Sequence, residues 1–143
     1  MNAKKLVGAI VAAFVILFVA GFLVHGVWLG DTYRSMRQQS FSFRSEAALQ
    51  HKVWIVWVSD LLYSILFAWV YARGMERRSW LGQGVRFGVL MSLFTIVPSA
   101  LNDYVVYNLS HMLVLDWICA GFVTLILMGI AVAAILKAPP AAA

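Results

Sequence analysis

The sequence is poor in charge and in cysteine, and both shortages narrow the classes of protein to which it can belong. Lys, Arg, Asp and Glu make up 12% of the 143 residues, whereas hydrophobic residues make up 63%. Soluble domains carry about 25% charged residues, so a chain of this composition requires lipid around it. The one cysteine, Cys119, lies in an apolar stretch and excludes an intrachain disulfide, a Cys-x-x-Cys redox pair and a thiolate metal site.

Motifs for catalysis and for nucleotide binding are also missing. The sequence contains neither a glycine-rich phosphate loop nor a recognisable pairing of a nucleophile with a base. The net charge of +5 does not indicate a nucleic-acid surface, because the basic residues stand in short clusters between apolar runs. Such clusters are typical of membrane topology signals, and we expect no nucleic-acid partner.

Four long apolar runs account for most of the chain and predict an all-α membrane protein, a bundle of four transmembrane helices. A helix needs about 20 apolar residues to cross a hydrocarbon core of roughly 30 Å. The predicted helices cover residues 6–29, 51–71, 84–107 and 112–136, within a single transmembrane domain of residues 1–143. The first run exceeds the apolar region of a signal peptide, so we expect it to be retained. The polar segment 30–50 is expected to be the one longer outer loop, with at most a short surface helix.

The basic residues predict that both termini are cytoplasmic, an N-in and C-in topology. Basic residues near helix ends resist translocation, so the side that carries more of them is expected inside the cell. The side of the termini has seven, which are Lys4, Lys5, Arg73, Arg77, Arg78, Arg86 and Lys137. The side of the 30–50 loop has four, which are Arg34, Arg37, Arg44 and Lys52. We expect this multi-pass topology in the inner membrane of a bacterium.

Asp60 is the residue of the predicted bundle whose insertion into the membrane costs the most free energy. It follows Lys52 by eight residues and precedes Arg73 by thirteen, which places it about 12 Å and about 20 Å from these two markers along a helix. A carboxylate at this depth costs at least about 2.5 kcal/mol on membrane-insertion scales. We therefore expect Asp60 to face the interior of the bundle and to find hydrogen-bond donors there, or to be neutral.

Polar side chains on three predicted helices share the estimated depth of Asp60 and predict an intramembrane polar layer. Measured from the basic residues near the helix ends, the same depth is reached near Ser99 on the third helix and near Thr124 on the fourth. The predicted layer comprises Asp60, Tyr63, Ser64, Ser99, Asn102 and Thr124. Two interpretations stay open: a small polar cavity or proton-linked site at Asp60, and a hydrogen-bond network that only fixes the packing.

The third predicted helix indicates the polar layer independently. Its polar residues follow one another at intervals of three, four and three, which predicts one helical face formed by Ser92, Thr95, Ser99 and Asn102. Pro98 lies among them and has no N–H, so the carbonyl of Phe94 loses its helical partner. We expect this helix to be kinked and to present a polar face to the interior.

A second group of polar residues is expected at the outer ends of the helices. The group consists of His25, Asp31, Asn102, Asp103, His111 and Asp116. Imidazoles and carboxylates could bind a divalent metal, and His25 and His111 could serve as axial haem ligands. However, no ligand pair has a helical spacing such as His-x-x-x-His, and Asp and Asn are common helix caps. We therefore predict no cofactor and interpret Asp116 as a complement to the positive end of the last helix.

Small residues recur four positions apart at three places in the apolar runs. The pairs are Gly26 and Gly30, Gly84 and Gly88, and Gly129 and Ala133. Such spacing lets two helix backbones approach closely in lipid, where apolar side chains alone give little drive for association. We expect these pairs to form contacts within one bundle, and the alternative is a homodimer face.

The order of apolar, polar and glycine-rich segments along the chain is distinctive. It comprises the apolar stretch 8–30, a polar loop, the stretch GQGVRFGVLM at 82–91, the stretch YNL at 107–109, and Asp116 at the start of the last helix. Together these segments resemble a family of small, uncharacterised bacterial four-helix inner-membrane proteins with no known activity. The resemblance covers most of the chain and implies a fold and a bacterial origin, with no catalytic residues to transfer. The long, Arg-containing loop and the Trp-rich second helix depart from that pattern.

These observations favour a non-catalytic accessory or assembly subunit of a larger bacterial membrane complex. Such a subunit would pack its helix faces against other subunits, lipids or pigments, or against a second copy of itself. The alternative is a small proton-linked transporter or hydrophobic-ligand carrier that uses Asp60. Small multidrug resistance proteins are similar in having four helices and one buried acid, but here the acid lies on the second helix. An enzyme that uses Asp60 and Tyr63 for proton chemistry ranks third, because nothing identifies a substrate.

Overall fold

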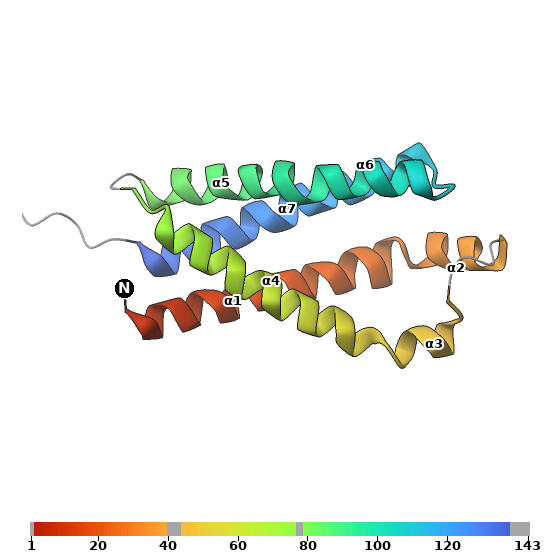
Figure 1. The fold of residues 1–143 in the computed structure, drawn as a ribbon, viewed down its shortest axis with the longest axis horizontal. Coiled ribbons are helices and arrows are strands. Elements are labelled where there is room, and N and C mark those ends of the chain that lie inside the picture. Colours follow the sequence, from red (N-terminus) through yellow and green to blue (C-terminus); the bar gives the residue numbers. More distant parts are fainter. Residues whose placement is uncertain (1, 40–43, 77–78, 138–143) are drawn as a thin grey trace, which may run out of the picture.

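Four membrane-length helices form the structure (Figure 1). The computed structural model describes residues 2–39, 44–76 and 79–137, and this part of the chain contains no β-strand. The spans that are long and apolar enough to cross a membrane are Ala3–Trp28, Glu46–Arg73, Trp80–Val106 and His111–Leu136. The predicted all-α fold with four transmembrane helices is therefore confirmed, and the chain is a multi-pass membrane protein.

Three of the four spans are assembled from shorter elements. The first consists of α1 (Ala3–Gly21) and the π-helix η1 (Phe22–Trp28), and the second of α3 (Glu46–Gln50) and α4 (Val53–Arg73). The third consists of α5 (Trp80–Met91), the π-helix η2 (Ser92–Ile96) and α6 (Val97–Val106), whereas the fourth is α7 (His111–Leu136) alone. Consecutive spans run in opposite directions. The start of α1 and the end of α7 therefore lie at one end of the bundle, the termini end, and α2 (Gly30–Gln39) lies at the other, the α2 end (Figure 1).

The segment that the sequence predicts as a loop is largely helical. α2 follows the first span directly, and α3 precedes α4. Within α2, the Arg34 guanidinium donates to the Asp31 carboxylate at 2.7 Å, one turn away. The Ser45 hydroxyl caps α3 by accepting from the N–H of Ala48. The sequence does not reveal α2 because this helix has few apolar residues whose spacing would mark a buried face.

α7 is the central helix and packs against both α1 and α5. The approach to α5 is close because glycines face each other, with Gly84 and Gly88 on α5 and Gly129 on α7. A Cβ added at Gly88 would lie 2.5 Å from the Cα of Ile126, a distance that no side chain can adopt without moving backbone. This small-residue contact therefore lies inside one bundle. At Gly30, by contrast, an added Cβ would meet nothing within 4 Å.

α4 is joined to its neighbours at the termini end and is largely uncovered at the α2 end. The rings of Phe67 and Tyr71 contact Phe87 on α5, with centroid distances of 4.7 and 5.3 Å. Every residue of 53–59, however, is exposed. In this part α4 touches α1 through the rings of Trp57 and Phe18. The first two turns of α4 therefore offer apolar surface to whatever surrounds the bundle.

The termini end carries the basic residues that enter the prediction of topology. Arg86 pairs with Glu76 at 2.8 Å, and Gln83 exchanges two hydrogen bonds with the backbone of Glu76. The Lys137 ammonium lies 5.9 Å from the centroid of the Trp80 ring. Two further basic residues of that prediction, Arg77 and Arg78, lie outside the described residues. The side of the membrane on which this end lies stays a prediction.

Candidate functional site

Two hydrogen bonds through one phenol tie α2 to the bundle. The Trp117 indole Nε1–H on α7 donates to the Tyr33 hydroxyl at 2.6 Å. The same hydroxyl lies 2.7 Å from Nδ1 of His25 on η1. The His25 and Tyr33 rings also stack, with centroids 5.9 Å apart. Tyr33 therefore joins α2 both to η1, which precedes it directly, and to α7, which lies far away in the sequence.

The directions of these bonds follow from the donors that are available. An indole N–H can only donate, so the Tyr33 oxygen accepts from Trp117. The Tyr33 hydroxyl donates to Nδ1 of His25 when the neutral ring carries its proton on Nε2, and accepts from Nδ1 in the other tautomer. Burial raises the pKa of the Tyr33 phenol above its ordinary 10.0; the Trp117 bond opposes this shift, and the charge of Asp116 adds to it. Tyr33 thus stays protonated at neutral pH.

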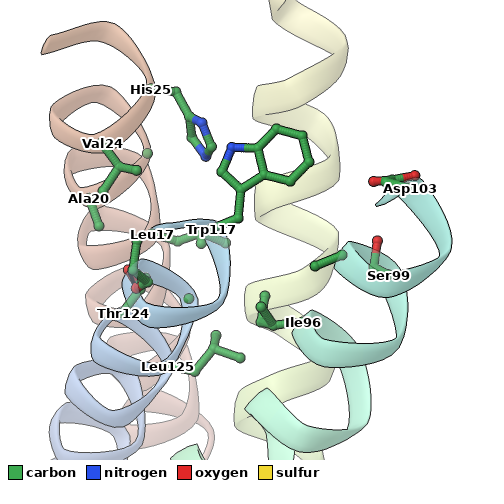
Figure 2. A pocket seen from close by; sticks show the side chains of 14 residues that line it. Leu17, Ala20, Val24, His25, Ile96, Ser99, Asp103, Trp117, Thr124 and Leu125 are labelled. Carbon is green, nitrogen blue, oxygen red and sulfur yellow. Dashed lines mark hydrogen bonds between the residues drawn. The ribbon is translucent and has the colours of Figure 1, made fainter. Parts of the chain in front are cut away.

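A cavity of about 250 Å³ lies beside the hydrogen bonds of Tyr33 with Trp117 and His25, between η1, α6 and α7 (Figure 2). His25 and Trp117 contribute to one side of it, and Ser99 and Asp103 extend from the third span on the other. Most of the remaining wall is apolar and includes Leu17, Val24, Ile96, Ala100 and Leu125. The cavity thus combines an apolar body with a few polar groups, the usual composition of a small-molecule site.

The structure brings together only part of the predicted outer polar cluster. His25 and Asp103 line the same cavity, whereas His111 and Asp116 do not. His111 is exposed at the start of α7, and Asp116 is half-buried and acts on Tyr33 through its charge. Within the described ranges, no three His, Cys, Asp or Glu side chains gather as a metal site would require. Haem ligation by the two histidines stays a hypothesis.

Asp60 lies on the face of α4 that points to the bundle. Ser64, Phe67 and Tyr71 are buried, and they follow Asp60 at intervals of four, three and four residues, which trace one helical face. Asp60 itself is half-buried, one turn beyond Ser64. Ser64 donates to the backbone carbonyl of Asp60 at 2.7 Å, but no residue of the described chain donates to its carboxylate. Asp60 thus faces the bundle at the point along α4 between the exposed residues 53–59 and the buried residues that begin at Ser64.

One side-chain hydrogen bond in the region of the predicted polar layer connects two helices. The hydroxyls of Tyr63 on α4 and Thr95 on η2 lie 3.2 Å apart. Thr124 instead bonds within its own helix, donating to the carbonyl of Ala120 at 2.8 Å. Ser99 lines the cavity. The predicted layer therefore divides into an α4–η2 contact, a cavity wall and an acid without a donor.

The π-helix η2 explains why the polar face predicted on the third span is not continuous. Its closing hydrogen bond spans five residues, one more than in an α-helix. The extra residue rotates the next turn, so Ala100 is buried and Asp103 half-buried, while Asn102 is exposed. Pro98, which cannot donate to the preceding turn, accounts for the altered pattern. Asp103 thereby reaches the interior in place of Asn102.

Sequence reasoning missed the central role of Tyr33 and Trp117. Both are aromatic residues near the ends of predicted helices, a pattern that indicates membrane-interface anchors. A signal was present, because a buried tyrosine or tryptophan requires a partner for its polar atom. The pairing itself was not predictable, since it depends on residues 30–39 forming the helix α2 directly after η1 and beside the start of α7 (Figure 1).

Comparisons with known proteins identify the family. The model of the family described as "Protein of unknown function (DUF1761)" matches residues 8–133, which reach from the first span to the fourth. No curated protein and no solved structure matches the chain. The match agrees with the resemblance to a small uncharacterised family. The chain belongs to the DUF1761 family.

Proposed function

We propose that this member of the DUF1761 family is a non-catalytic subunit of a larger protein complex in the bacterial inner membrane, with both termini in the cytoplasm. The observation that carries the proposal is the environment of Asp60. Its side chain is on the bundle-facing side of α4, and no residue of the described chain donates to its carboxylate. A carboxylate in the hydrocarbon core costs at least about 2.5 kcal/mol, so a helix of another subunit would supply the missing donor.

The surface around Asp60 supports such a contact. The apolar side chains exposed on the same face of α4 as Asp60 are Val53, Val56 and Trp57, which precede it by seven, four and three residues. Transmembrane helices associate through van der Waals packing and interhelical hydrogen bonds. A partner helix that carries a Ser, Thr, Asn or Lys opposite Asp60 would provide both at once. Lipid, by comparison, would cover the apolar residues but leave the acid without a donor.

Site-specific photo-crosslinking in the native membrane tests this proposal. A photoreactive amino acid is introduced at Leu61, which is 45% exposed on α4 beside Asp60, and in a matched control at Leu90, which is 55% exposed on α5. We expect the variant at Leu61 to form an adduct of one defined mass with a second membrane protein, and the variant at Leu90 to form none. Equal adducts from both positions, or adducts only with a second copy of this chain, would contradict the subunit role.

Substitutions at Asp60 test whether a hydrogen bond to its side chain holds the partner helix at this contact. Asp60→Asn retains an oxygen that accepts a hydrogen bond, so the adduct at Leu61 should persist. Asp60→Leu removes every acceptor and should reduce the adduct, by up to about 30-fold if the interhelical bond contributes about 2 kcal/mol. An adduct that is unchanged in Asp60→Leu would indicate that the acid has no part in the contact.

A proton-linked carrier is the second candidate, and the depth of Asp60 favours it. The bond between Tyr63 and Thr95 aligns α4 with η2. One turn from this bond toward the α2 end lies Asp60 on α4 and Ser99 on α6, and Ser99 lines the cavity. An ionisable acid therefore stands near the depth of a small cavity, an arrangement that a carrier requires. In proteoliposomes, a carrier would give pH-dependent flux that Asp60→Asn abolishes.

A further inference from the structure

We propose that the cavity between η1, α6 and α7 binds a small organic cation, an ammonium group on a short aromatic or aliphatic body. The site lies within one chain, and no residue of α4 lines it. It is therefore independent of the proposed subunit role, and either proposal can fail without the other.

The sign of the charge in the cavity favours a cation. Asp103 is the acid that lines it, and no Lys or Arg of the described chain does so. His25 contributes no positive charge while its Nδ1 accepts from Tyr33. Asp116, close enough to Tyr33 to act on its pKa, adds further negative charge near the cavity. An anion would therefore meet repulsion here, whereas an ammonium group would find a carboxylate.

The aromatic wall adds a second means of recognising a cation. Trp117 lines the cavity, and its Nε1–H is engaged by Tyr33, which fixes the orientation of the indole. Figure 2 shows the indole and Asp103 on opposite sides of the cavity. A cation over an indole face gains about 0.5–2 kcal/mol. An ammonium group between the two would interact with the carboxylate and with the ring together.

The ionisable groups of the cavity lie at one end of it along the spans. His25 and Asp103 lie near the α2 end of their spans, whereas Leu17 and Ile96 lie about 10 Å deeper along the same spans. An amphiphilic ligand therefore has one favourable orientation, with its charged head at the α2 end and its apolar body toward the membrane centre.

The volume of the cavity limits the size of the ligand. Dry protein cavities of about 150 Å³ accommodate benzene. At about 250 Å³, this cavity has room for one ring with a short alkylamine substituent. The ligand class is thus a monocyclic or short-chain amine.

Binding of 2-phenylethylammonium to the purified, full-length protein in lipid nanodiscs tests the proposal by calorimetry. The neutral analogue 2-phenylethanol has nearly the same shape and lacks the charge. We expect the amine to bind more tightly than the alcohol. Asp103→Asn should weaken binding of the amine by about tenfold or more, because the ammonium group then meets a neutral amide in place of a charged carboxylate, and it should leave binding of the alcohol unchanged. The matched control is Asp31→Asn, which removes the same charge from exposed α2 and should change neither.

A second variant keeps the test independent of the polar residues. Ala20 lines the cavity, so Ala20→Leu should fill part of it and weaken the binding of both compounds. Unchanged binding in this variant would place the amine elsewhere and overturn the proposal. It would also be overturned if the wild-type protein binds the alcohol as tightly as the amine or binds neither. Equal losses in Asp103→Asn and Asp31→Asn would indicate only general electrostatic attraction to the α2 end.

Discussion

Trp117 and Tyr33 are 84 positions apart in the sequence, and the indole N–H of the first donates to the hydroxyl of the second at 2.6 Å. This bond joins the middle of α2 to the central helix α7. The Tyr33 hydroxyl also bonds to His25 on η1. The polar helix α2, outside the four spans, therefore holds two side chains that line the cavity, His25 and Trp117. The position of α2 and the shape of the cavity are therefore linked.

Removal of the Tyr33 hydroxyl should release α2 from the bundle. Tyr33→Phe leaves the Trp117 N–H and Nδ1 of His25 without their partner, and a half-buried polar group left unpaired costs about 1–3 kcal/mol. We expect amide hydrogen exchange in α2 to accelerate by about 5- to 150-fold, with little change in α7. The control is Tyr104→Phe on α6, where the exposed phenol makes no hydrogen bond within the described chain. Equal exchange in the two variants would contradict the link.

Docking of α2 should also fail at alkaline pH. Burial raises the pKa of Tyr33 above 10.0 in the docked state, so below pH 10.0 both the docked and the undocked states keep the phenol proton and the stabilisation is complete. Above that value the undocked state loses its proton first, and the stabilisation is lost as the pH rises through the higher, docked-state pKa. The ultraviolet phenolate absorbance of the wild-type protein minus that of Tyr33→Phe should therefore show one tyrosine that titrates above pH 10.0. A titration at or below 10.0 would be inconsistent with a buried phenol.

The glycine contact between α5 and α7 should tolerate no side chain. In Gly88→Ala the new Cβ would meet the backbone of Leu125 and Ile126 at 2.5 Å, and overpacking of this kind costs about 1–3 kcal/mol. Gly82→Ala on the same helix is the matched control, because an added Cβ there meets nothing within 4 Å. We expect a lower unfolding temperature in detergent for the first variant alone. A Gly88→Ala protein as stable as the Gly82→Ala protein would show that α5 and α7 can move apart without loss of stability, and it would contradict this prediction.

Much of the fold was predictable because lipid imposes strong constraints on a chain. Runs of about 20 apolar residues must be helices in a membrane, since every backbone polar group needs a partner there. The pair Gly84 and Gly88 predicted a close helix contact, and the structure places it against α7. The sequence allowed a short surface helix in the segment 30–50 but did not locate α2, because it is a polar helix whose few apolar residues give no clear period.

The candidate site was less predictable than the fold. The depth of Asp60 could be estimated by counting residues from Lys52 and Arg73, because the rise of an α-helix is constant. The same counting treats the third span as a regular helix, so it could not reveal that η2 turns Asp103 inward and Asn102 outward. Tyr33 and Trp117 carry no local signal of their pairing, which arises only when α2 docks.

The proposed N-in and C-in topology predicts which introduced cysteines react from outside the cell. Ser45 and Ser79 are both exposed, the first at the α2 end and the second at the termini end. In a Cys119→Ala background, a membrane-impermeant maleimide should label Ser45→Cys in intact spheroplasts and should label Ser79→Cys only after the membrane is permeabilised. The reverse pattern would place both termini outside and refute the topology.

The most direct test of the subunit role is purification of Asp60→Asn from the native membrane in mild detergent, followed by quantification of co-purifying proteins and of pH-dependent transport or binding. The amide keeps the size and an acceptor of the carboxyl group and removes its ionisation. If another subunit completes Asp60, the variant should be recovered in the same complex with the same stoichiometry as the wild type, because interhelical hydrogen bonds of about 0.6–2 kcal/mol do not require a charge. A well-folded Asp60→Asn protein that has lost a pH-dependent transport or binding activity would contradict this account and would identify a carrier.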